Sequence, residues 1–162
     1  MDRVNRDELI KRYAAGERNF AGVKLGGDLS GIDLSGADFS GNKMDEFSFE
    51  RAILKRTSFI NARLAQSCLD LADLTEADLR GARLSYANLR VTNLTNADLR
   101  GARFHETSFD RANLTGANLS GTDLRGCILW EANLTGANLE GSSLRRLTFR
   151  NTIMPDGTIR NS

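Results

Sequence analysis

The chain has 162 residues, of which 40% are hydrophobic, and 22 basic side chains nearly balance 21 acidic ones. This composition argues against a disordered chain, which combines low hydrophobicity with high net charge, and it is enough for one domain with a real core. No run of about 18 apolar residues occurs, so we expect no membrane-spanning helix. The start is charged and has no secretory leader, so we expect a cytoplasmic protein with two free thiols.

The first predicted element is a short helix over roughly 6–15. Asn5 followed three residues later by Glu8 is typical of a capping box, and Gly16 is typical of a helix end. We expect this capping helix and its lead-in to occupy residues 1–19 and to cover the first coil of the repeat that follows.

A five-residue period then runs to the end of the chain. Every fifth residue from Leu29 to Ile159 is Leu, Phe, Met or Ile, at all 27 positions. Two residues before each of these centres the side chain is usually small, with Ala in 13 cases. The exceptions are Ile32, Asn42, Phe47 and Leu147.

This period matches neither the 3.6 residues of a helix nor the two residues of a strand. A chain that turns a corner every five residues would instead point all the centres inward. The seven letters ADLRGAR occur at 77–83 and again at 97–103. Four corners therefore make a coil of twenty residues, and successive coils stack about 4.8 Å apart, as in any β-ladder.

The pattern A-[D/N]-L-x-x, as in ADLTEADLRGARLSYANLR and RANLTGANLSGTDL, resembles the pentapeptide-repeat family over about residues 20–160. The resemblance implies an all-β fold, a right-handed quadrilateral β-helix of about seven coils over 20–162, and a bacterial, often cyanobacterial, origin. The first coil is expected to be imperfect, because Phe20 and Leu25 are five residues apart but Leu29 follows after only four.

The corners carry a second signal. In one column the second residue after the centre is always Gly or Asn, which tolerate the positive φ that a type II turn requires at its third position. Its members are Gly41, Asn61, Gly81, Gly101, Gly121, Gly141 and Asn161. Another column has Arg56 and Glu76 in this role, and there we expect a different turn.

The last predicted element is a tight turn over 154–157, in the letters MPDG, which contain the chain's single proline. We interpret both ends as plain caps on a monomer. The alternative, which the resemblance implies, is a weak dimer through the C-terminal coil.

Stacking also converts the sequence into surface columns. Asn93, Asn113 and Asn133 lie beside Thr75, Thr95, Thr115 and Thr135, and ladders of like polar residues can bond along a stack, so we interpret them as structural.

A column of arginines is less easily explained, because two unit charges 5 Å apart repel by about 0.8 kcal/mol in water. One interpretation is a ladder paired internally with Asp78, Asp98 or Glu106. The other is a site for an anion or an acidic partner, made of Arg63, Arg80, Arg83, Arg100 and Arg103.

Outward apolar residues form a second candidate surface, because Leu71, Val91 and Trp130 fall on one face and predict a protein contact. Charge is uneven along the rod as well. Residues 27–79 carry 5 basic and 10 acidic side chains, and residues 80–162 carry 11 and 7. Such a dipolar rod could orient on a partner.

Signals of catalysis and cofactor binding are absent. No Gly-rich phosphate loop joins a strand to a helix, and no Cys/His cluster has the spacing of a metal site. The single histidine, His105, is not accompanied by any sign of a cleft or oxyanion hole. Cys127 occupies an inward slot. We therefore expect no cofactor, no metal, no catalytic residue and no enzymatic activity.

The leading hypothesis is a rigid, non-enzymatic module that binds an unknown protein partner. The resemblance implies an alternative, a DNA mimic that inhibits or protects gyrase or topoisomerase, but such mimicry needs a strongly negative surface, and this chain is nearly neutral. A third hypothesis is nucleic-acid or anion binding through the arginines. A pI near 7.8 and the lack of interleaved aromatic residues disfavour it.

Overall fold

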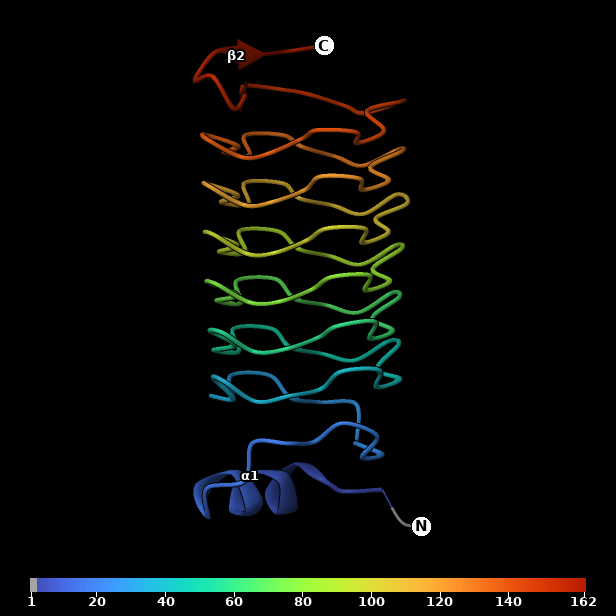
Figure 1. The fold of residues 1–162 in the computed structure, drawn as a ribbon, viewed down its shortest axis with the longest axis vertical. Coiled ribbons are helices and arrows are strands. Elements are labelled where there is room, and N and C mark those ends of the chain that lie inside the picture. Colours follow the sequence, from blue (N-terminus) through green and yellow to red (C-terminus); the bar gives the residue numbers. More distant parts are fainter. Residues whose placement is uncertain (1–2) are drawn as a thin grey trace.

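The structure, a computed structural model, describes residues 3–162. The chain winds into a rod of stacked coils, with helix α1 at one end and a small hairpin at the other (Figure 1). Its named elements are α1 (Arg6–Ala14), β1 (Thr152–Ile153) and β2 (Ile159–Arg160).

Helix α1 closes the N-terminal end of the rod. The side chain of Asn5 accepts a hydrogen bond of 2.9 Å from the backbone N–H of Glu8, as the capping signal predicts. The helix ends at Ala14, and Gly16, just beyond its C-cap Ala15, has a φ of 97° that favours a residue without a Cβ. Leu9 is fully buried against the first coil, so the helix covers the core at this end.

Parallel bridges between residues twenty apart hold the coils together. Asp78 bridges to Asp98, and Asp98 to Asn118. Leu79 donates its N–H to the carbonyl of Asp98 at 2.7 Å, in the next coil. The right-handed quadrilateral β-helix that the family resemblance implies is confirmed.

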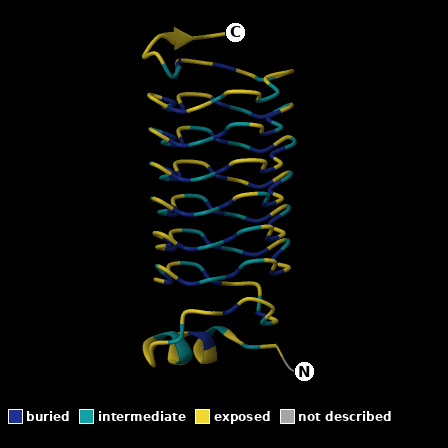
Figure 2. Ribbon diagram, viewed as in Figure 1, coloured by how far each residue is buried: buried dark blue, intermediate teal, exposed yellow. Residues whose placement is uncertain are grey.

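The interior is a continuous column of the repeat centres. From Leu29 to Leu134 every centre is at most 2% exposed, so the predicted inward orientation is confirmed for these residues. It is wrong for Ile159, which is 67% exposed in the last turn of the chain. Buried residues recur at the same places in each coil (Figure 2). The rings of Phe20, Phe39 and Phe59 stack at centroid distances of 5.5 and 5.7 Å.

The small side chains two residues before the centres are also inward, and the polar ones among them are satisfied. Thr107 donates its hydroxyl to the carbonyl of Leu84 at 2.7 Å. Cys127 makes the equivalent contact to the carbonyl of Phe104 at 2.6 Å. Burial raises the pKa of Cys127 to about 12, so this thiol stays protonated and inert.

All four corners use the same kind of turn. Every fifth residue from Gly31 to Asn151 has a φ between 49° and 73°. From the corner at Gly36 to the one at Gly141 a hydrogen bond closes each turn, such as Ala77 N–H to the carbonyl of Leu74 at 3.0 Å. One positive φ at the third position is the type II pattern.

The expectation of a different turn at Arg56 and Glu76 is therefore wrong. Their φ values are 55° and 58°, although neither residue type favours the left-handed region. Coils above and below fix the corner through the ladder, and the inward centres on both sides leave only one path for the chain. Packing thus offsets a strain of about 1–2 kcal/mol at each non-glycine corner.

The C-terminal end is less covered than the N-terminal one. β1 and β2 pair antiparallel around a turn closed by Gly157 N–H to the carbonyl of Met154 at 2.9 Å. Ile153 continues the ladder above Asn133. Leu144 is a centre like those below it, yet it is 38% exposed, since within residues 3–162 no further coil lies over it.

Replacing Leu99 by Ala should lower the free energy of unfolding by about 2–5 kcal/mol, because it leaves a cavity in the closed column of centres. Chemical denaturation measures the change. The control is Leu71→Ala at an exposed corner, where we expect less than about 0.5 kcal/mol. A loss below about 1 kcal/mol at Leu99 would show that the inward assignment is wrong.

Val91→Asn should raise the free energy of unfolding by up to about 1 kcal/mol. The β-branched Val91 has a φ of 56°, and Asn accepts this conformation with less strain. Gly101→Val is the reverse control, since a Cβ there meets nothing within 4 Å and only the φ of 66° opposes it. A Gly101→Val protein as stable as wild type would contradict the assignment of strain to these corners.

Candidate functional site

The outer surface consists of four faces, which we number 1 to 4 in chain order. Their inward centres are Leu69, Leu74, Leu79 and Leu84, with the equivalent residues every twenty positions. On each face the residues just before and just after a centre point outward. Each therefore generates a column of side chains one coil apart.

The arginine column, Arg63, Arg83 and Arg103, lies on face 4, and its members are successive bridge partners. Arg63 forms an ion pair of 2.5 Å with Asp45 in the coil below. Arg83 and Arg103 are exposed and form no ion pair within 4.0 Å among residues 3–162. Arg83 and Arg103 thus lie one coil apart without a direct ion pair, and the next member of the column is Asp123, which pairs with Arg125.

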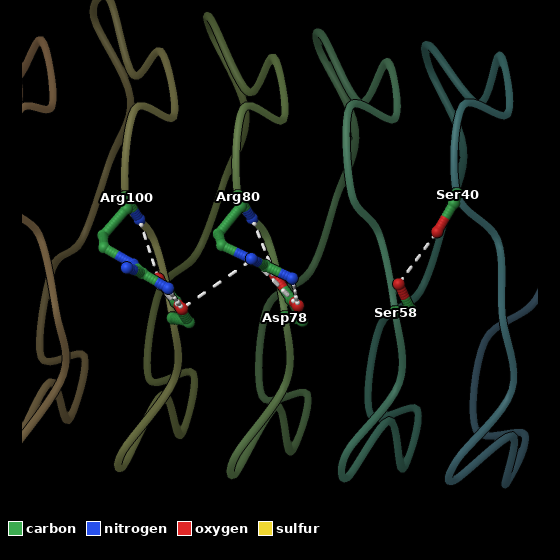
Figure 3. Close-up of polar contacts among 6 residues, drawn as sticks. Ser40, Ser58, Asp78, Arg80 and Arg100 are labelled. Carbon is green, nitrogen blue, oxygen red and sulfur yellow. Dashed lines mark hydrogen bonds and ion pairs between the residues drawn. The ribbon is translucent and has the colours of Figure 1, made fainter.

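Arg80 and Arg100, on face 3, are in a different situation. Each guanidinium folds back onto the aspartate two residues earlier, at 2.7 Å to Asp78 and 2.6 Å to Asp98 (Figure 3). A longer contact of 3.8 Å joins Arg80 to Asp98 in the next coil. The predicted pairing with these two aspartates is confirmed, so the charges of Arg80 and Arg100 are balanced within face 3.

The pairing changes the acidity of the carboxylates. The hydrogen bond from the Arg100 side chain lowers the pKa of Asp98, although partial burial opposes it. The same arrangement recurs one face further, where Arg125 lowers the pKa of Asp123. Glu106, the third partner considered for the arginines, lies instead 3.4 Å from Nε2 of His105.

Face 4 continues toward the C-terminal end with further basic residues. Arg125 bonds to Asp123 at 2.7 Å, whereas Arg145 and Arg146 form no ion pair in the described part of the chain. A depression of about 240 Å³ opens here, where Gly126 contributes no side chain. Its lining residues are His105, Glu106, Arg125, Gly126, Arg145 and Arg146.

Sequence reasoning missed this depression. Its residues belong to two adjacent columns, one on face 4 and one at the corner that follows it. The residue type in each column changes from one coil to the next, so no repeated pattern marks the depression in the sequence. The available signal was the pair Arg145–Arg146, which places two charges side by side on the last coil of that face. Nδ1 of His105 is buried without a hydrogen-bond partner among the described residues.

The apolar candidates do not form one patch. Leu71 and Val91 lie in the same corner column, one coil apart, and are 44% and 43% exposed. The next member of that column is Arg111, which separates them from Trp130. The indole of Trp130 packs under the guanidinium of Arg150, 5.4 Å from the ring centroid. The structure therefore brings together Leu71 and Val91 and leaves Trp130 in a polar surrounding.

The columns of Asn and Thr on face 2 bond to each other. Thr95 donates its hydroxyl to Oδ1 of Asn93 at 2.6 Å and accepts from Nδ2 of Asn113, in the next coil, at 3.1 Å. The same pattern links Asn93 to Thr75. The Asn and Thr side chains of these columns thus bond to one another within and between coils, which supports the structural interpretation.

Two kinds of site are not found in the described residues. No group of three or more His, Cys, Asp or Glu side chains within residues 3–162 is placed to hold a metal ion. Over the same range no helix has both the length and the apolar character needed to cross a membrane.

Comparisons with a family model and with solved structures point to the same family. A family model described as pentapeptide repeats matches in eight copies, with segments between residues 19 and 156. No curated protein matches the chain.

Several solved structures are similar to the chain. HetL, a pentapeptide repeat protein involved in heterocyst differentiation regulation from the cyanobacterium Nostoc sp. strain PCC 7120, is 28% identical, with 96% of this chain and 99% of HetL covered and a TM-score of 0.31. Rfr23 from the cyanobacterium Cyanothece 51142 is 23% identical, with 88% and 97% covered and a TM-score of 0.39. A pentapeptide repeat protein from the Arabidopsis thaliana thylakoid lumen is 34% identical, with 72% and 70% covered and a TM-score of 0.32.

The stability contributed by Asp98 should depend on pH in a defined direction. Its folded pKa is lowered, so its contribution is complete above the unfolded value of about 3.9 and is lost as the pH falls through the folded pKa. We expect the difference in free energy of unfolding between wild type and Asp98→Asn to be largest near neutral pH and to shrink below about pH 4. Denaturation curves across this range measure it, and a difference that stays constant with pH would contradict the pairing with Arg100.

Proposed function

Since this chain belongs to the pentapeptide-repeat family, we propose that it is a rigid, non-enzymatic module that binds a protein partner through the arginine column of face 4. The observation that carries the proposal is the contrast between two neighbouring faces. Arg80 and Arg100 have their own aspartates, whereas Arg83 and Arg103 have none within 4.0 Å among residues 3–162. A partner that brings carboxylates to face 4 would relieve this repulsion and gain forked hydrogen bonds.

The fold supports a binding role of this kind. The backbone under the arginine column is fixed by parallel bridges on both sides, and its inward neighbours Leu84 and Phe104 are fully buried. A surface that is already ordered loses little conformational entropy when a partner docks. The binding free energy that this chain contributes would therefore come mainly from the few arginine charges that the rigid backbone holds in place.

Mimicry of DNA is less well supported. It needs a continuous row of free carboxylates. Here Asp45 is paired with Arg63, and Asp73 lies 3.2 Å from Lys55. Asp78 and Asp98 are likewise neutralised within face 3. These carboxylates already have basic partners within the rod.

Other contacts are compatible with the same proposal. Leu71 and Val91 give a small apolar corner that could extend an interface. The partly uncovered centre Leu144 and the exposed Ile159 support the weak dimer considered for the C-terminal coil. The dimer and the cytoplasmic location both stay predictions.

Affinity capture from a lysate of the source cells tests the proposal. We expect wild type to retain a specific protein that a variant with Arg63→Glu, Arg83→Glu and Arg103→Glu does not retain. The matched control is Arg51→Glu, Arg56→Glu and Arg111→Glu, which reverses as many charges at the corners of other faces. Thermal unfolding of all three proteins checks that they are folded.

The outcomes separate the surfaces. Loss of the partner in the face 4 variant alone supports the arginine column and identifies the protein. Equal loss in the control would mean that overall charge, not face 4, governs capture. Capture unaffected by either variant would contradict the proposal and leave the apolar corner as the surface to test.

A further inference from the structure

We infer that the segment bound by face 4 is an acidic α-helix lying along the axis of the rod, with carboxylates every three or four residues facing Arg83 and Arg103. The inference rests on the proposed function and specifies the shape and charge of the partner. Three features of face 4 carry it: the spacing of its charges, the size of the neighbouring side chains, and the carboxylates that interrupt it.

The first feature is spacing. Successive arginines of the column are bridge partners, so they repeat at about 4.8 Å along the rod. A helix rises about 5.4 Å per turn, and side chains three or four residues apart lie on one line. The mismatch is roughly 0.6 Å per coil, which the long arginine side chain can absorb over several coils. An extended strand presents same-side residues every 6.6 Å or so, and it would lose register after one coil.

The second feature is the size of the side chains beside the arginine column. The adjacent outward positions of face 4 carry the small, half-buried residues Ala65 and Ser85 beside Arg63 and Arg83, and His105 beside Arg103. Beyond them, at the corner, Tyr86 is 49% exposed, and its ring meets the edge of His105 at a centroid distance of 5.5 Å. A helix above these small residues can place its acidic side over the arginines and an apolar side against Tyr86.

The third feature is the charge sequence toward the C-terminal end. The depression beyond the column offers Arg125, Arg145 and Arg146, but Glu106 and Asp123 interrupt the positive surface. A nucleic acid carries a phosphate at every nucleotide and would meet these carboxylates with repulsion. A protein helix can place a neutral or basic residue there, so the mixed pattern favours a protein.

The probe for the experiment is a labelled, alanine-rich peptide of about 20 residues, long enough to be helical in water. One version has glutamates three and four residues apart on a single face. The other has the same composition with the glutamates distributed around the helix. Circular dichroism verifies that both are helical, and fluorescence anisotropy at low salt measures their binding to the full chain.

We expect the one-faced peptide to bind more tightly than the distributed one. The double variant Arg83→Gln, Arg103→Gln should weaken this binding about three- to tenfold, as expected for two exposed ion pairs. The control Arg51→Gln, Arg56→Gln removes equal charge elsewhere and should change affinity by less than about twofold. A short DNA duplex is measured in parallel.

Four results would overturn the inference. Equal affinity for the two peptides, or equal weakening in the control, would show attraction by charge without a helical register. Tighter binding of the duplex, dependent on Arg83 and Arg103, would assign the surface to nucleic acid. Absence of peptide binding, while capture from the lysate still depends on the arginine column, would reject the helix and leave the proposed function standing.

Discussion

The hydrogen-bonded ladder between coils is the constraint from which the rest of the structure follows. Each backbone segment bonds to the one twenty residues later, as Asp78 does to Asp98. To keep this register every coil must turn four times in the same places. The buried centres, the small inward slots and the positive φ at each corner are consequences of that requirement, and they hold even where the residue type is unfavourable, as at Arg56 and Val91.

Most of the fold could be predicted because the ladder requires a corner and an inward centre every five residues, and this requirement is directly visible as the five-residue period of the sequence. The capping of α1 could be predicted from Asn5 and Glu8 for a similar local reason. The corners could not, since stacking overrides the local preference of residues such as Arg56. Nor could the role of Asn42, an exception to the small inward slots. Its side chain donates to the carbonyl of Phe20 at 2.9 Å, where the register slip leaves the first coil irregular.

The charged surface was only partly predictable, and the reason is the reach of the side chains. In the letters D-L-R an aspartate and an arginine flank one centre on the same face, so Arg80 and Arg100 pair locally. Around Leu84 the two flanking residues are Arg83 and the uncharged Ser85, so Arg83 has no such neighbour. This local rule separates the two groups. The depression around Gly126 depends on how two adjacent columns change from coil to coil, which no local pattern expresses.

The twenty-residue register also has an evolutionary consequence. Inserting or deleting one complete coil keeps every column aligned and leaves both caps in place, whereas a change of one residue displaces all the centres beyond it. The recurrence of ADLRGAR at 77–83 and 97–103 is what duplication of such a unit would produce. A lineage can thus lengthen the rod, and any charged column along it, in steps of one coil without redesigning the core.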